Sequence, residues 1–416
     1  MGHAEWRLDV NSGTTTRPPA FFAAIIAGIF LVIAPLSLAT QWESSAQLKL
    51  LRIGLCFLGG ISALLSGALR RSGGATPAIL WFAFIYVLAA TWSRYPLQGI
   101  AYKTLFLSSL CFGIAMGLSS PTSASLRQLM KWLGGIATVA AVVTWYEYLR
   151  NPAETTRLGR LAIYGINANA VGMTAGGYLF LTSYLAINDR GIWRLLGTLG
   201  TAILILLVVA TGSRAALALA VLGGSLQLVP WIRRPARFLL PVAGVTLILL
   251  VWSAQLPVEA TERLTDFEKN TRAGMWQAGI KLILTQPVFG HGWLSSSGRS
   301  TGNLQNLYLQ TVAESGIFGA IALVIAGISI SSTARRVHRT LPPERAPQFW
   351  FALAIVIALA THGLAESALI LGTTINTFLF GFGLGVLDFL SRIGTTQSRF
   401  VKTRIPEYQC VAIGHS

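Results

Sequence analysis

The stretch LLGTLGTAILILLVVATGSRAALALAVLGGSLQLVPW, residues 195–231, is an apolar run whose only break is the triplet Gly212-Ser213-Arg214. A helix needs about 20 apolar residues to cross the hydrocarbon core of a membrane, so this run is too long for a single crossing. The triplet therefore predicts a turn between two membrane-spanning helices, and the chain is expected to cross the membrane more than once.

Similar apolar blocks recur along all 416 residues, of which 53% are hydrophobic and 11% are charged. Barrel strands would instead give alternating segments of about ten residues, and this pattern is absent from the sequence. The blocks predict an all-α polytopic membrane protein with about twelve transmembrane helices. The expected spans are residues 21–40, 48–69, 77–92, 101–118, 132–149, 168–188, 195–211, 214–231, 238–254, 307–331, 347–365 and 373–391.

A long polar interruption, roughly residues 255–306, separates the ninth expected span from the tenth. Its segment TRAGMWQAGIKLILTQP has apolar residues at near-helical spacing, which predicts an amphipathic helix on the membrane surface that ends before Pro287. We expect one integral membrane domain over residues 1–416, with 255–306 as a periplasmic lid and 392–416 as a basic cytoplasmic tail.

The net charge of +17 is distributed over the loops between the spans. Most lysines and arginines fall on one side if the amino terminus is cytoplasmic, which satisfies the positive-inside bias and places both termini in the cytoplasm. The charge thus indicates topology and contact with membrane lipids, and its scatter argues against binding of nucleic acid. The sequence contains no D-x-D motif or Cys-x-x-Cys motif, so we expect no metal and no cofactor.

Arginines on the expected periplasmic side depart from that bias. Arg214 lies in a tight connection near the bilayer, where a cation is costly unless an anion meets it, and a lipid-linked diphosphate would be such an anion. Arg272 opens the amphipathic helix and is a second candidate. The alternatives are an Arg214 that reaches lipid phosphates and an Arg272 that pairs with Glu268 in solvent. The other arginines of this side are Arg94, Arg150, Arg157, Arg160, Arg263 and Arg299.

Four segments occur in a specific order: IYGINANAVG (163–172), GSRAALAL (212–219), R-x-x-x-W followed by PVFGHGW (272–293), and NLYLQTVAESGIFG (306–319). In this order and topology the chain resembles the O-antigen ligase and O-antigen polymerase superfamily. The resemblance implies a metal-independent, GT-C-like glycosyltransferase in the bacterial inner membrane. Such an enzyme moves a glycan from undecaprenyl diphosphate to an acceptor on the periplasmic face, and Arg214 and Arg272 would hold the diphosphate.

One position departs from the family pattern, since Gln305 stands where a histidine is normally found. Glutamine orients a hydroxyl but cannot take its proton at neutral pH. Another residue is then the base, or the substitution disables the enzyme, or catalysis relies mainly on leaving-group activation. Glu314 would face away from Gln305 on a regular helix, which favours an orienting role. His291 lies in a flexible, glycine-flanked loop, and His362 and Glu366 share a face at the end of a span.

We therefore expect catalytic roles for Arg214, Arg272, Gln305 and Glu314. The expected substrate-binding residues are Arg94, Arg160, Asn167, Asn169, His291, Asn306, Tyr308, His362 and Glu366. The expected reaction is ligation of O-antigen to lipid A-core. A glycan polymerase of the same superfamily would use the same donor and a glycan acceptor, and a transporter or flippase of lipid-linked sugars is the alternative from another class.

Overall fold

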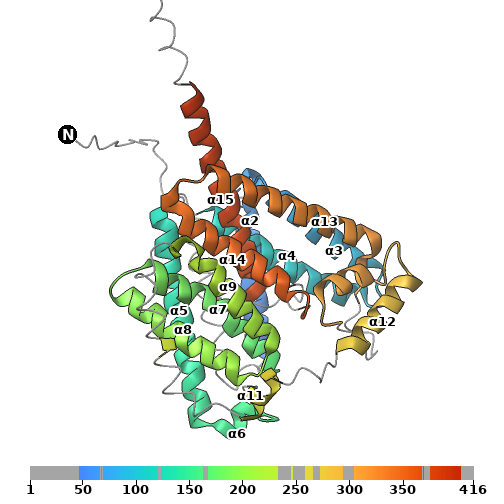
Figure 1. The fold of residues 1–416 in the computed structure, drawn as a ribbon. Coiled ribbons are helices and arrows are strands. Elements are labelled where there is room, and N and C mark those ends of the chain that lie inside the picture. The colour runs from blue at the N-terminus through green and yellow to red at the C-terminus, as the bar shows by residue number, and fades with distance from the viewer. Residues whose placement is uncertain are drawn as a thin grey trace, which may run out of the picture.

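The computed structural model describes residues 46–65, 67, 69–119, 123–162, 167–232, 245–246, 258–265, 272–293, 304–367, 369 and 375–403. These residues form a helical protein (Figure 1). The strands within them are β1 Thr156–Arg157 and β2 Arg160–Leu161, which pair as one short antiparallel hairpin. The expected span 21–40 and most of the expected span 238–254 lie outside the described residues.

Six described helices are long and apolar enough to cross a membrane. They are α4 Pro96–Leu118, α5 Ser123–Arg150, α7 Ala168–Asn188, α8 Ile192–Ala210, α9 Arg214–Leu228 with η5 Val229–Trp231, and α13 Leu307–Thr340. The predicted all-α multi-pass membrane protein is confirmed at this level. The number of twelve spans and their orientation stay predictions.

The described residues also form further helices and short helical turns. They are α2 Ala46–Leu65, η2 Leu69–Arg71, α3 Thr76–Leu88, η3 Ala89–Trp92, α6 Pro152–Thr155, α11 Val258–Thr265, α12 Arg272–Thr285, η7 Pro343–Arg345, α14 Ala346–His362 and α15 Ile375–Thr403. Helix α12 occupies the place of the predicted amphipathic helix and ends before Pro287, as predicted. The tail expected from residue 392 is helical as far as Thr403, because α15 continues into it.

The predicted turn between α8 and α9 is formed by Thr211, Gly212 and Ser213. Gly212 has φ of 57°, a left-handed conformation that glycine adopts without strain. The Ser213 hydroxyl oxygen accepts a hydrogen bond from Ala216 N at 3.4 Å and so caps the start of α9. Arg214 is consequently the first residue of α9.

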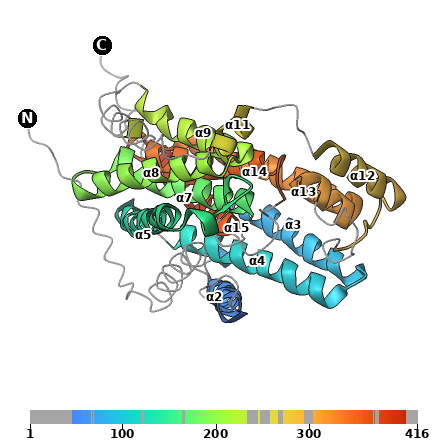
Figure 2. The same cartoon turned by 90° about the horizontal axis from the view of Figure 1, so that it is seen from below.

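Helix α15 packs against α4, α14 and α13, with further contacts to α7 and α3, and lies near the middle of the view in Figure 2. The seam between α4 and α15 is lined by glycines on both helices. A Cβ atom on Gly113 would overlap the carbonyl oxygen of Phe378, and one on Gly381 would overlap that of Leu110. Helices α4 and α15 are therefore closely packed, and the two backbones touch directly.

Valine in place of Gly113 is expected to lower the stability of the protein, because the new methyl groups must push α15 away. Overpacking of this kind costs about 1–3 kcal/mol. Thermal unfolding in detergent measures the effect. The matched control is Gly327→Val in α13, since no atom lies within 4 Å of a Cβ built there. Equal unfolding temperatures for the two variants would contradict the direct backbone contact.

Candidate active site

Helix α13 departs from helical geometry at Gly316, where φ is 60° and ψ is −152°. The loop that follows α12 is hydrogen-bonded to this break. His291 N donates to Ala313 O at 2.8 Å, Gly292 N donates to Glu314 O at 2.9 Å, and Ile317 N donates to Pro287 O at 2.9 Å. The glycine-flanked loop expected to be flexible is thus a packed element, and it fixes α12 against α13 (Figure 1).

The side chain of His291 closes the end of α12. Its Nε2 lies 2.9 Å from Leu282 O and 3.0 Å from Thr285 Oγ1. Since a carbonyl oxygen only accepts, the bond to Leu282 requires the hydrogen on Nε2. His291 was expected to reach a substrate, but these bonds direct it to the helix end.

The start of α13 is tied to the end of α14. Asn306 caps α13, with its Oδ1 accepting from Tyr308 N and Leu309 N at 3.0 Å each, while its Nδ2 donates to Leu364 O at 2.9 Å. The Tyr308 hydroxyl donates to Ala360 O at 2.8 Å. Asn306 and Tyr308 were expected to bind substrate, but these contacts give them a structural role that positions the preceding residue, Gln305.

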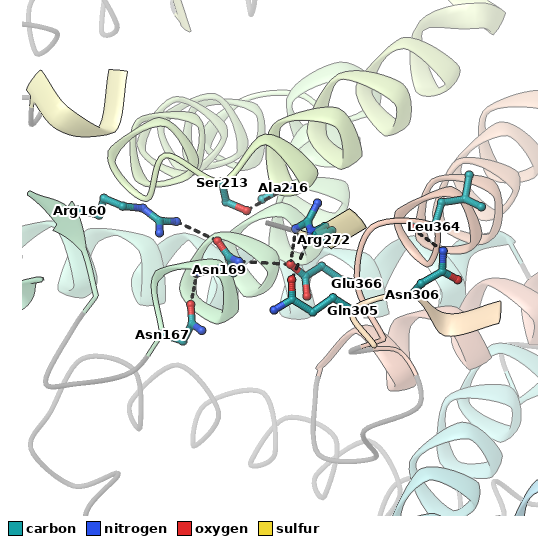
Figure 3. Close-up of polar contacts among 10 residues, drawn as sticks. All are labelled: Arg160, Asn167, Asn169, Ser213, Ala216, Arg272, Gln305, Asn306, Leu364 and Glu366. Atoms are coloured by element: carbon teal, nitrogen blue, oxygen red, sulfur yellow. Dashed lines mark hydrogen bonds and ion pairs between the residues drawn. The ribbon is translucent and has the colours of Figure 1, made fainter. Parts of the chain in front are cut away.

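A polar network links four segments that are distant in sequence (Figure 3). Arg272, at the start of α12, donates from Nη2 to Glu366 Oε1 at 2.8 Å and from Nε to Gln305 Oε1 at 3.2 Å. Asn169 of α7 donates from Nδ2 to the same Glu366 oxygen at 3.2 Å. Arg160 of β2 donates from Nη2 to Asn169 Oδ1 at 2.8 Å. Five residues with expected roles therefore meet at one place.

The network extends to the turn that precedes Arg214. Arg160 Nε donates to Thr211 O at 2.7 Å, in the turn between α8 and α9. Arg214 is half-buried and begins α9, where backbone N–H groups and the helix dipole also favour an anion. Asn167 caps α7 by accepting from Asn169 N at 2.9 Å and so orients the start of that helix. The guanidinium group of Arg160 thus connects the network to the turn that precedes the first turn of α9.

Glu366 is the acidic centre of this network. Its side chain is 13% exposed, and that of Arg272 is 24% exposed. Burial raises the pKa of the Glu366 carboxyl, whereas the positive charge of Arg272 and the hydrogen bonds from Arg272 and Asn169 oppose this rise. The carboxylate is therefore held in place by two donors and is a better proton acceptor than an exposed one.

The expected side-chain pair of His362 and Glu366 is not formed. Helix α14 ends at His362, so Glu366 lies beyond the helix, and only its backbone N–H reaches His362, donating to the carbonyl oxygen at 3.0 Å. The Glu366 carboxylate turns to Arg272 instead. The spacing of four residues indicated a shared face only on the assumption of a continuous helix.

Glu314 belongs to a second cluster, in the interior. Its Oε2 lies 2.8 Å from Lys103 Nζ of α4, and Gln310 Nε2 donates to its Oε1. Lys103 also lies 3.8 Å from the ring centroid of Tyr86 in α3. The Glu314 side chain is only 1% exposed, which argues against the expected catalytic role. The assumption of a regular helix was wrong, because Gln305 precedes α13 and has φ of 47°.

Lys103 was not predicted from the sequence to take part in a site, and the structure shows that it is buried. A signal was available, since Lys103 and Glu314 are opposite charges at similar depth after the starts of their helices. Arg94, an expected binding residue, is exposed, and its guanidinium carbon lies 5.6 Å from the ring centroid of Tyr95.

Residues 199–324 match the family model described as O-antigen ligase. The matched region contains Arg214, Arg272, Gln305 and Glu314, and it overlaps most of the segment on which the resemblance rests. The predicted relation to the O-antigen ligase and polymerase superfamily is confirmed. A search of curated proteins found no match to the chain.

Proposed function

We propose that this multi-pass membrane protein transfers a glycan from undecaprenyl diphosphate to lipid A-core, since residues 199–324 match the O-antigen ligase family model. The transfer takes place on the periplasmic face of the bacterial inner membrane and follows a metal-independent, GT-C-like mechanism. The observation that carries this proposal is the network of Arg160, Asn169, Glu366 and Arg272, which adjoins the turn before Arg214.

The chemistry of the donor explains why arginines are needed. Displacement of a diphosphate from an anomeric carbon leaves negative charge on the departing oxygen, and fixed cations stabilise that charge. A guanidinium group grips two oxygens with its planar fork and stays charged at physiological pH. We assign Arg214 and Arg272 to the diphosphate, with the first turn of α9 supplying further N–H donors.

The remaining residues of the network act as positioning groups. Arg160 joins the Thr211 carbonyl to Asn169, and Asn169 in turn holds Glu366. Gln305 accepts from Arg272 Nε and so fixes the plane of that guanidinium. This arrangement presets the geometry of the site before the donor binds, which is the general requirement for electrostatic catalysis.

Purified protein in vesicles with a defined undecaprenyl-diphosphate glycan tests the proposal, with lipid A-core and a glycan repeat offered as separate acceptors. We expect transfer to lipid A-core. Transfer only to the glycan repeat would identify a polymerase, and movement of the donor across the bilayer without transfer would identify a flippase.

Arg214→Ala is expected to lower the rate in this assay by at least about 10²-fold, the effect of removing one preset charge-stabilising group. The matched control is Arg157→Ala, because Arg157 is exposed on the neighbouring strand of the hairpin that carries Arg160. Thermal unfolding confirms that both variants are folded. Full transfer by Arg214→Ala would overturn the assignment of the donor site.

A further inference from the structure

We propose that Glu366 is the general base that takes the proton of the acceptor hydroxyl, the role that Gln305 cannot fill. This inference rests on the proposed function. Within the part of the chain that the structure describes, both side-chain hydrogen bonds of Glu366 are made by Oε1, which accepts from Arg272 and Asn169. Oε2 is the oxygen that receives the proton.

The surroundings of Glu366 suit a base. Two donors from different helices fix its orientation, just as a catalytic base requires a third group to orient it. Arg272 contacts the Glu366 carboxylate and is also proposed to bind the diphosphate. The base and the leaving group would therefore contact the same guanidinium group. Burial raises the pKa of the carboxyl and brings its proton affinity closer to that needed at neutral pH.

The charged and titratable groups around Glu366 come from three segments. Arg272 of α12 touches it directly, Arg160 of β2 acts through Asn169, and His362 ends α14 four residues earlier. The positive charge of Arg272 favours the ionised carboxylate and opposes the effect of burial, which raises the pKa of Glu366.

The other candidates are less suitable. The imidazole of His291 is bonded to the end of α12, and Glu314 is buried with Lys103. His362 is the remaining rival, because its Nε2 is buried without a hydrogen-bond partner among the described residues. His362 is only 6% exposed, however, whereas the side chain of Glu366 is 13% exposed, so an acceptor reaches the carboxylate of Glu366 more easily.

The reaction step is a balanced displacement. The acceptor hydroxyl gives its proton to Glu366 Oε2 as its oxygen forms a bond to the anomeric carbon of the donor. The bond between that carbon and the diphosphate oxygen breaks, and the electron pair leaves with undecaprenyl diphosphate, whose charge Arg214 and Arg272 stabilise. Glu366 then releases the proton to water.

Glu366→Gln is the discriminating variant, because an amide oxygen still accepts from Arg272 and Asn169 but takes no proton. We expect the kcat of transfer to fall at least about 10²-fold, with the donor KM within about threefold of the original protein. The acid limb of the pH profile of kcat/KM is expected to disappear. The matched control is Glu154→Gln, since Glu154 is exposed on α6.

A second variant tests the same role by rescue. Gln305→His in the Glu366→Gln background places an imidazole beside Arg272 and is expected to restore part of the lost kcat. An acid limb that persists in Glu366→Gln and disappears in His362→Gln would overturn the inference in favour of the histidine. A higher donor KM with unchanged kcat in Glu366→Gln would also overturn it, since Glu366 would then only position Arg272.

The outcomes separate this inference from the proposed function. If Glu366→Gln keeps its kcat while Arg214→Ala loses transfer, the donor site stands and the assignment of the base fails. If Arg214→Ala and Arg272→Ala both retain full transfer, the assignment of the donor site fails. If the unaltered protein transfers no glycan to any acceptor, the proposed function itself fails, whatever Glu366→Gln does.

Discussion

Arg272→Ala is expected to abolish most glycan transfer, with kcat/KM falling at least about 10²-fold, while the protein still folds and reaches the membrane. The side chain of Arg272 is only 24% exposed, and its guanidinium connects α12 to Glu366 and Gln305. Alanine removes a charge from the leaving-group site and also releases two acceptors that the guanidinium orders. The measurement is the rate of transfer at several donor concentrations.

Lysine at position 272 is expected to restore little of this activity. The lysine ammonium is a compact charge on one nitrogen. The planar arginine guanidinium instead donates to Gln305 from Nε and to Glu366 from Nη2 at the same time. The control is Lys281→Ala, because Lys281 is exposed on the same helix. Full transfer by Arg272→Ala would contradict the assignment, and a loss as large in Lys281→Ala would show that any change in α12 is harmful.

Lys103→Met is expected to destabilise the protein more than any other single change considered above. It leaves the Glu314 carboxylate, 1% exposed, without the cation that lies 2.8 Å away. Removal of one partner from a buried ion pair costs about 3–5 kcal/mol, because an uncompensated charge stays in the interior. Thermal or denaturant unfolding in detergent measures this loss.

The double variant Lys103→Met/Glu314→Gln is expected to recover most of that stability, since it removes the uncompensated charge. Lys131→Met is the matched control. Lys131 pairs with Asp189 at 3.5 Å, but its side chain is 21% exposed, so solvent screens the pair and the expected loss is below about 1 kcal/mol. Equal losses for Lys103→Met and Lys131→Met would contradict the buried character of the first pair.

Much of the fold follows from local sequence. Helix α7 covers the expected span 168–188, and the break between α8 and α9 falls at the polar triplet. Helix α12 ends before Pro287 for the same local reason. The bend of α13 at Gly316 was not predictable in this way, because it depends on hydrogen bonds to a loop that precedes the helix in sequence.

The site was predictable in its residue types and less so in its connections. Arg160, Asn169, Arg272 and Glu366 were all expected to act on substrate, and they lie together. Residue type does not reveal which backbone groups a side chain will bind, so the bonds of His291, Asn306 and Tyr308 to backbone groups could not be predicted from the sequence. The ion pair of Lys103 with Glu314 joins positions far apart in the chain, and its only signal in the sequence is their opposite charge at similar depth in two helices.

The break at Gly316 has a consequence for exchanging parts between proteins of this kind. Carbonyl groups that a helix no longer satisfies within a membrane must find donors elsewhere. Here His291 N and Gly292 N supply them to Ala313 and Glu314, and Pro287 O receives the displaced Ile317 N–H. The loop and the bent helix are therefore one transplantable unit. A chimaera that contains the loop of one protein and the bent helix of another would leave these backbone groups without hydrogen-bond partners. The crossover points therefore belong before α12 and after the bend.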